Sequence, residues 1–265
     1  MNASLQPSRS STEIACSVWN ALLLRESLTR VSGSRAAWLW LLLEPVAHLG
    51  IVLVIFSSIR SRMINGVDVA LFLAVGILGY NLFRNSATRS MTAISANRAL
   101  FSYRQVKPVD VVMVRAFLEG VIQLFVGAVL LAAMSLIGFD VLPREPLAVF
   151  SVFALLWLFG FGMGLVLSVG STLIPEVGRV ANLAFVPLYF MSGVLYAPSM
   201  LPPQLREWLL INPLVGGLDL LRGAFFSNYN VAADVDLKYL AGFAFVSTFL
   251  GLALQVRFAE RLVME

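Results

Sequence analysis

Residues 146–175 form a run of 30 consecutive positions without Asp, Glu, Lys or Arg. An α-helix needs about 20 mostly apolar residues to cross the hydrocarbon core of a membrane. Several shorter uncharged runs occur elsewhere in the 265 residues, and only 13% of the chain is charged. Soluble globular proteins contain about 25% charged residues. The sequence therefore predicts an all-α integral membrane protein.

Six segments of a transmembrane domain, residues 36–265, are predicted to cross the membrane. They cover residues 36–59, 69–88, 110–139, 147–172, 180–196 and 238–257. Residues 198–233 differ, because Pro and Gly divide them into apolar pieces of about half a membrane thickness. Such pieces are typical of periplasmic re-entrant helices, and an ordinary amphipathic loop is the alternative. Asp219 and Arg222 are expected to hold these pieces together; presenting a charge to a polar substrate is the alternative.

Residues 1–35 are predicted to be a cytoplasmic N-terminal segment that contains an amphipathic interface helix. Ser10 and Glu13 have the spacing of a capping box at a helix start. The apolar residues that follow share one helical stripe: Ile14, Ala15, Val18, Trp19 and Leu22. This helix is too polar to cross the membrane, so we expect it to lie along the surface with Trp19 at headgroup level.

Basic residues indicate the orientation, because cytoplasmic loops of membrane proteins carry an excess of Lys and Arg. With the N-terminus inside, 12 of the 19 Lys and Arg residues fall in residues 1–35, 84–107, 173–179 and 257–265. The opposite side, residues 58–68, 139–147 and 194–238, holds 6. Both termini are therefore predicted to be cytoplasmic. Since basic residues mostly set orientation in a membrane protein, the net charge of +4 does not indicate a nucleic-acid partner.

Glu44 and His48 lie four residues apart inside the first predicted crossing. Ionisable groups inside a membrane are costly and usually face protein or water. The two residues either line a transport pathway or form a structural pair, held to each other or to an arginine such as Arg84.

Two other pairs are predicted to be structural. Arg115 and Glu119 have the same spacing and are expected to form an ion pair with each other near the inner interface. Gly160 and Gly164 have the small-residue spacing that lets two membrane helices approach closely.

The residue types argue against catalysis by this chain. The single cysteine, Cys16, excludes an intramolecular disulfide, and one histidine without a cysteine partner argues against a zinc site. No arrangement of Ser, His and Asp suggests a nucleophile with its base. No phosphate-binding G-x-x-x-x-G-K-[ST] motif is present, so another chain would have to bind ATP. We therefore predict no catalytic residue, metal or cofactor here.

The stretch NRALFSYRQVKPVD, residues 97–110, is basic and aromatic between two apolar segments. A short helix is expected to end before Pro108, because Pro disfavours helix at the preceding residue. Aromatic anchors surrounded by arginines are typical of protein–protein contacts, and a membrane-surface helix that meets lipid phosphates is the alternative. The residues that would make the contact are Asn97, Arg98, Leu100, Phe101, Tyr103, Arg104 and Lys107.

Four motifs, in order, resemble a known family. They are LLLRESLTR followed by AAWLWLLLEPVAH, then SANRALFSYRQVKPVD, PLYFMSGVLYAPSMLP and INPLVGGLDLLRGAF. The chain is similar over nearly its whole length to permease subunits of ABC-type polysaccharide exporters, most closely the capsular polysaccharide export inner-membrane proteins of Gram-negative bacteria (the KpsM type). The resemblance implies a channel-forming subunit in the bacterial inner membrane that exports a long, usually acidic, lipid-linked polysaccharide.

The resemblance also implies partners. Two copies of the chain would form the channel, each on a nucleotide-binding subunit that binds ATP and Mg. Residues 96–107 would be the coupling helix, with Phe101 and Tyr103 docked in a cleft of the ATPase and the basic residues at its acidic rim. The N-terminal helix would touch the ATPase too. A periplasmic adaptor and an outer-membrane pore would continue the export route.

Candidate channel residues follow from the chemistry of the implied cargo. A sliding sugar chain is held by aromatic faces and loosely placed donors, and an anionic polymer is attracted by arginines. The candidates, with the Glu44 and His48 pair, are Trp38, Trp40, Tyr80, Phe83, Arg84, Arg89, Tyr189 and Tyr196.

Other functions remain open on the sequence. One alternative within the same class is an ABC exporter permease whose cargo is O-antigen, teichoic acid or another substrate. Outside it, a proton-coupled secondary transporter would use Glu44 and His48 as its coupling pair. A membrane enzyme acting on lipid-linked sugars is a third class, and the missing acid–base arrangement argues against it.

Overall fold

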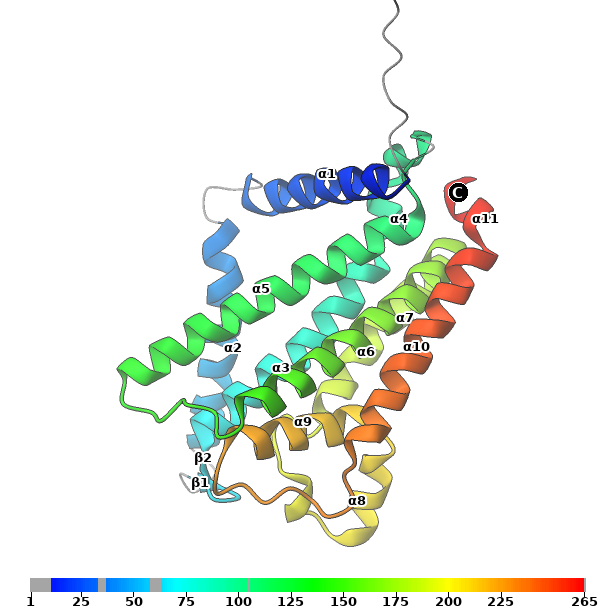
Figure 1. Ribbon diagram of the computed structural model, residues 1–265. Coiled ribbons are helices and arrows are strands. Elements are labelled where there is room, and N and C mark those ends of the chain that lie inside the picture. The colour runs from blue at the N-terminus through cyan, green and yellow to red at the C-terminus, as the bar shows by residue number, and fades with distance from the viewer. Residues whose placement is uncertain (1–10, 33–36, 58–62, 104, 265) are drawn as a thin grey trace, which may run out of the picture.

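The computed structural model describes residues 11–32, 37–57, 63–103 and 105–264, and these are mostly helical, as predicted (Figure 1). The first elements are α1 (Ser11–Ser32), α2 (Ala37–Ser57), β1 (Met63–Ile64), β2 (Val67–Asp68), α3 (Val69–Met91), α4 (Ala93–Ala96), the 3-10 helix η1 (Arg98–Ser102) and α5 (Pro108–Leu136). They are followed by α6 (Pro146–Leu173), α7 (Pro175–Met191), the 3-10 helix η2 (Pro198–Met200), α8 (Pro203–Leu210), α9 (Pro213–Phe225), α10 (Leu237–Arg257) and α11 (Ala259–Met264).

The helices form a bundle with two different ends (Figure 1). At one end, α1 lies across the bundle close to α4, and α11 lies beside them. At the other end lie α8, α9 and the small antiparallel β1–β2 hairpin. The beginning and the end of the described chain are thus at the same end of the bundle.

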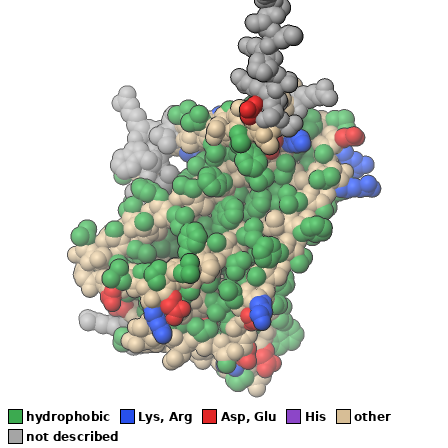
Figure 2. Space-filling model, viewed as in Figure 1, with side chains coloured by type: hydrophobic (Ala, Val, Ile, Leu, Met, Phe, Trp, Pro, Cys, Tyr) green, Lys and Arg blue, Asp and Glu red, His purple; other side chains and the backbone are tan. Residues whose placement is uncertain are grey.

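The middle of the bundle is suited to lipid. Among the described residues, four helices are long and apolar enough to cross a membrane: α3, α5, α6 and α10. The six predicted crossings also need α2, where the apolar stretch is Leu43–Ile55, and α7, which has 17 residues. The count of six therefore stays a prediction. Figure 2 shows hydrophobic side chains across the middle of one face and charged side chains toward its two ends.

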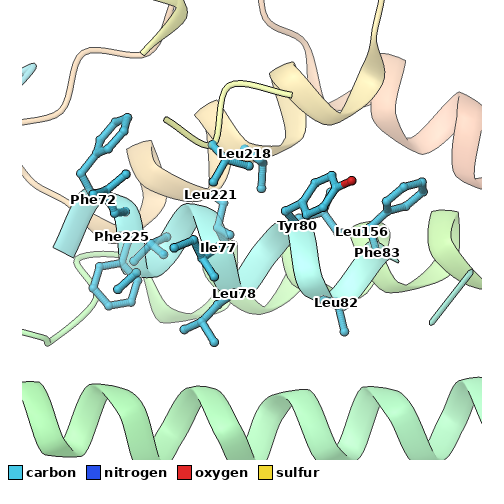
Figure 3. Packing of buried hydrophobic residues seen from close by; sticks show 14 of the residues in the cluster. Phe72, Ile77, Leu78, Tyr80, Leu82, Phe83, Leu156, Leu218, Leu221 and Phe225 are labelled. Atoms are coloured by element: carbon cyan, nitrogen blue, oxygen red, sulfur yellow. The ribbon is translucent and has the colours of Figure 1, made fainter. Parts of the chain in front are cut away.

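Helix α3 is the centre of the core. Its side chains point in several directions around the helix and meet Leu156 of α6 and Leu218 and Leu221 of α9 (Figure 3). Since α3 is surrounded by protein, apolar residues on all its sides are buried, including Phe72 and Leu82 at 0% exposure.

Close packing of α6 on α3 depends on the glycine pair, as predicted. A Cβ atom on Gly160 would lie 2.5 Å from the carbonyl oxygen of Phe83, and one on Gly164 would lie 2.4 Å from Cβ of Ser90. Neither position has room for a side chain, so the two glycines set the distance between the helices.

Arg222 of α9 fastens the end of the bundle opposite α1. Its guanidinium is fully buried and lies over the ring of Phe72, 3.6 Å from the ring centre. It donates hydrogen bonds to three carbonyl oxygens, those of Phe72 at 3.3 Å, Gly193 at 2.7 Å and Val194 at 2.7 Å. Burial lowers the pKa of Arg222 to about 10, so the group stays charged at neutral pH. One side chain thereby joins α9, α3 and the turn that follows α7.

Asp219, one turn earlier on α9, is buried as well. Its carboxylate accepts hydrogen bonds from the Tyr229 hydroxyl and, at 2.8 Å, from the Ala232 N–H. Asp219 thus binds the chain that leaves α9, while Arg222 binds the chain that enters the region. Asp219 therefore holds the second half-length piece to α9, as predicted, whereas Arg222 binds residues outside both pieces; both side chains are 0% exposed.

The predicted ion pair between Arg115 and Glu119 is wrong. Arg115 Nε lies 3.0 Å from Glu26 Oε1, and Glu119 Oε2 lies 2.7 Å from Nη1 of Arg30. The reason is that α1 packs along α5 and presents an acid and a base with the same four-residue spacing in the opposite order. Pairing between the helices neutralises all four charges where they are mostly buried.

Candidate functional site

The segment between α3 and α5 turns sharply at each of its ends. The Asn97 side chain closes the first turn, because its Nδ2 donates to the Ala93 carbonyl at 2.8 Å. After η1 the chain is extended, and Lys107 has the φ of −101° and ψ of 151° expected before a proline. Asp110 then accepts a hydrogen bond from the Lys107 N–H at 2.9 Å, which starts α5. The break predicted before Pro108 is confirmed; η1 itself is only Arg98–Ser102.

The seven residues predicted to contact the ATPase divide into an inner and an outer group. Phe101 is 8% exposed and packs in an apolar cluster with Leu22 of α1, Ile94 of α4 and Val111 of α5. Asn97 is also buried. The remaining described members lie farther out: Leu100 is half-buried, and Arg98, Tyr103 and Lys107 are exposed. Arg104 lies outside the described residues.

Tyr103 is the one of the two aromatic candidates that a partner could reach directly, since it is 65% exposed. Phe101 instead fixes the segment to the rest of the chain. Beside it is an apolar groove of about 890 Å³ between the start of α5 and the C-terminal helices, lined in part by Phe101, Lys107, Gln255 and Val263.

Part of the predicted channel set meets in one aromatic cluster. The rings of His48 and Tyr189 are 5.3 Å apart, and those of Tyr80 and Tyr189 are 5.1 Å apart, edge to face. The Tyr80 hydroxyl donates to the Phe185 carbonyl at 2.5 Å, while the buried Tyr189 hydroxyl has no partner among the described residues. The cluster joins α2, α3 and α7.

The other channel candidates are spread over several environments. Tyr80 and Phe83 are 1% and 2% exposed, so within one chain they support the cluster from inside. Exposed positions are Trp40, Glu44 and Arg89; half-buried positions are His48, Arg84, Tyr189 and Tyr196. The side chain of Trp38 lies outside the described residues. Among the described residues no hydrogen bond or ion pair joins Glu44 to His48, and the His48 ring lies beside that of Tyr189 instead.

Contacts from α1 to this segment were missed by the sequence reasoning. The indole N–H of Trp19 donates to Asp110 Oδ1 at 2.9 Å, and Arg25 Nη1 donates to Asn97 Oδ1 at 2.8 Å. The available signal was the matching four-residue spacing of charges in residues 26–30 and 115–119, which is compatible with pairing between two helices but does not require it.

A comparison with known protein families identifies the family of this chain. The model of the ABC-2 type transporter family matches residues 17–226, from α1 to the end of α9. The chain belongs to the ABC-2 type transporter family. The match includes the whole segment between α3 and α5. Membership in this family implies an ABC transporter with a partner ATPase.

Individual relatives of this ABC-2 permease are transport proteins. The chain is 37% identical over 246 residues to the polysialic acid transport protein KpsM of Escherichia coli, covering 93% of this chain and 95% of the relative. It is 26% identical over 243 residues to the capsule polysaccharide export inner-membrane protein CtrC of Neisseria meningitidis serogroup A (92% and 91%). It is 25% identical over 251 residues to the O-antigen export system permease protein RfbA of Klebsiella pneumoniae (87% and 89%). The chain is thus a membrane transport subunit homologous to capsule export proteins, and the predicted resemblance is confirmed.

Proposed function

We propose that this chain is the channel-forming subunit of an ATP-driven exporter that moves an acidic, lipid-linked capsular polysaccharide across the bacterial inner membrane. The observation that carries the proposal is the likeness, over 93% of the chain, to a polysialic acid transport protein. Polysialic acid is an acidic sugar polymer. The proposed cargo is therefore a long anionic glycan.

In this proposal ATP and Mg are bound by a separate nucleotide-binding subunit, two copies of which sit under two copies of the permease. The contact is made by the outer side of the segment between α3 and α5. Tyr103 is its exposed aromatic residue, and Arg98 and Lys107 are exposed cations beside it. This arrangement requires the end of the bundle that carries α1 and α11 to be cytoplasmic.

The proposed channel lies between two copies of the chain. In support, α2 and α7 expose large apolar side chains although both are attached to the core, among them Trp40 and Val46 on α2 and Leu183 and Phe190 on α7. Glu44, His48 and Tyr189 lie on the same two helices and would face the polymer. A periplasmic adaptor and an outer-membrane pore would then carry it onward.

The decisive experiment is co-purification of the tagged permease with its ATPase from the native host. Tyr103→Asp places a charge on the exposed ring position without disturbing the core, so we expect the permease to remain in the membrane but to lose the ATPase and export. The matched control is Trp208→Asp on α8, an exposed aromatic residue (76%) at the other end of the bundle, which should retain the ATPase. Normal ATPase binding and export by the Tyr103 variant would refute the coupling role.

An O-antigen is the second candidate cargo, because an O-antigen export permease is 25% identical to this chain. Deletion of the gene decides between the two. The polymer that accumulates inside the cells and disappears from their surface is the cargo. Transport that continues without any ATPase would instead favour a proton-coupled carrier that uses Glu44 and His48.

A further inference from the structure

We propose that a membrane phospholipid with an amine headgroup binds in a groove between α5 and α6, with one acyl chain inside the groove, its phosphate on Arg144 and its ammonium on Glu145. The site lies at the end of the bundle opposite α1, where the connection between α5 and α6 meets α9 (Figure 1). The inference does not depend on the proposed cargo, because it concerns the lipid that surrounds the protein.

The groove has a volume of about 240 Å³ and reaches from the outer side of the bundle to its core. Its mouth is formed by Leu124 of α5 and Phe150 of α6, which are 47% and 60% exposed. Its floor is formed by Leu78 of α3 and by Leu221 and Phe225 of α9, which are between 3% and 6% exposed. A molecule that enters between α5 and α6 therefore reaches α9.

The walls of the groove suit a hydrocarbon chain. Apart from Gln123, the described residues that line it have apolar side chains or none. Three of the helices that form it, α3, α5 and α6, are long and apolar enough to cross a membrane, so the groove opens at the depth of the lipid tails. An apolar cavity of about 150 Å³ stays dry and admits a benzene molecule. A groove larger than that takes a segment of one acyl chain.

The connection between α5 and α6 places two opposite charges at the end of the groove. Arg144 and Glu145 stand between two prolines, Pro143 and Pro146, that line the groove. Arg144 Nε and Glu145 Oε1 are 3.6 Å apart, and both side chains are 57% exposed. Because an exposed ion pair contributes little, both groups are available to a ligand. A guanidinium binds phosphate through parallel N–H groups, and a carboxylate accepts hydrogen bonds from an ammonium. An amine phospholipid carries both groups side by side.

Exposed leucines around this pair indicate its depth in the membrane. Leu142 and Leu147, on either side of the pair in the sequence, are 81% and 83% exposed. Leu136, at the end of α5, is 91% exposed. Large apolar side chains that are exposed next to charged ones are expected where the lipid tails meet the headgroups. Figure 2 likewise shows charged side chains toward the two ends of a hydrophobic face.

The headgroup contacts provide the selectivity of the site. Lipid tails are as apolar as the walls of the groove, so the hydrophobic effect does not favour the groove over the bilayer. An empty groove would lose dispersion contacts along its walls, which any acyl chain can restore. Arg144 and Glu145 then decide which lipid stays bound.

A lipid in this groove also supports α9. Leu221 and Phe225 of α9 lie under the acyl chain. The backbone N–H groups of Arg144 and Glu145 each donate to a carbonyl oxygen in the last turn of α9, at 3.0 Å. The residues that hold the headgroup are thus attached to the same helix that the acyl chain contacts. Bound lipid should therefore stabilise the position of α9 on the bundle.

The test measures lipid binding by the full chain, purified in a mild detergent and freed of native lipid. Native mass spectrometry counts the bound lipids, and thermal unfolding measures the stabilisation when phosphatidylethanolamine or phosphatidylglycerol is added in detergent micelles. We expect phosphatidylethanolamine to bind and to raise the Tm. Phosphatidylglycerol, which has no ammonium, should bind about threefold more weakly, the effect of losing one exposed ion pair.

Ala128→Phe tests the acyl chain. Ala128 lines the groove from α5, so an aromatic ring at this position fills it and should remove both the bound lipid and the rise in Tm. Ala133→Phe is the matched control, because Ala133 is exposed on the same helix but lies outside the groove. This variant should bind phosphatidylethanolamine as the wild type does.

Arg144→Gln tests the headgroup. It removes the charge on an exposed side chain and leaves the core unchanged, so we expect the affinity for phosphatidylethanolamine to fall about tenfold, as for a hydrogen-bonded charged group. Lys238→Gln, which removes an exposed cation at the start of α10, should leave the affinity unchanged. If Ala128→Phe does not accumulate in membranes, Arg144→Gln carries the test.

Several outcomes would overturn the site. It is wrong if the wild type binds no phosphatidylethanolamine, or if Ala128→Phe and Arg144→Gln bind it as the wild type does. An equal loss in Ala128→Phe and Ala133→Phe would mean that the lipid belongs to the general shell around the bundle. Equal binding of the two lipids would refute the amine headgroup. Cross-linking of an Ala128→Cys variant to another membrane protein in cells would assign the groove to a partner helix instead.

Discussion

Gly76 shows how one missing side chain makes room for a buried charge. A Cβ atom at this position of α3 would lie 2.1 Å from Nη2 of Arg222. The guanidinium cannot retreat, because three carbonyl oxygens and the Phe72 ring hold it on other sides. The sequence contains both residues but gives no sign that they meet, since 146 positions separate them.

We expect Gly76→Ala to lower the free energy of unfolding by about 3 kcal/mol, because overpacking displaces a buried charge from its acceptors. Thermal unfolding of the purified protein in detergent measures the change. Gly50→Ala on α2 is the control: its Cβ would meet nothing within 4 Å, and alanine favours a helix, so stability should be equal or higher. An equal loss of stability in the Gly76→Ala and Gly50→Ala variants would show that the contact with Arg222 does not cause the effect.

At the scale of elements, the sequence predicted the features that neighbouring residues determine. Long apolar runs became helices, Pro108 ended the preceding segment, and the Gly160 and Gly164 pair marked a close helix contact. The β1–β2 hairpin was missed although Asn65 and Gly66, both with positive φ (49° and 82°), are a typical turn pair.

Contacts between side chains of different helices could not be predicted from the sequence. The four-residue spacing of Arg115 and Glu119 is satisfied equally well within one helix or across two, and the sequence does not tell which. The inward position of Phe101 has the same cause: its neighbours, Leu22 and Val111, belong to other helices. Whether a residue of the candidate site contacts a partner or its own chain is decided by tertiary packing.

The ion pairs between α1 and α5 give an element-scale prediction. Glu119→Arg should lower stability by about 3 kcal/mol, because it leaves Arg30 beside a second cation where little water reaches. Combining it with Arg30→Glu restores opposite charges across the contact and should recover at least half of the loss. Thermal unfolding of the two single variants, the double variant and the wild type measures the coupling. Additive losses would mean that the two helices are not in this register.

At the scale of the whole molecule, we predict that the two ends of the bundle face opposite sides of the membrane. The one native cysteine, Cys16, is exposed on α1, and Trp208 is exposed on α8 at the other end (Figure 1). A membrane-impermeant maleimide applied to intact spheroplasts should therefore not label the wild type until the cells are lysed. Trp208→Cys in a Cys16→Ser background should be labelled at once.

The basic-residue count and the coupling role both depend on this result. If Cys16 reacts in intact cells and the cysteine at position 208 does not, the segment between α3 and α5 lies outside and no cytoplasmic ATPase can bind it. If both cysteines react in intact cells, the two ends of the bundle lie on the same side of the membrane. The exposed apolar side chains of α5 and α10 would then have to be buried by something other than lipid. If position 208 is labelled in intact cells and Cys16 is protected, then α1, the segment between α3 and α5, and α11 lie in the cytoplasm, where an ATPase can bind them.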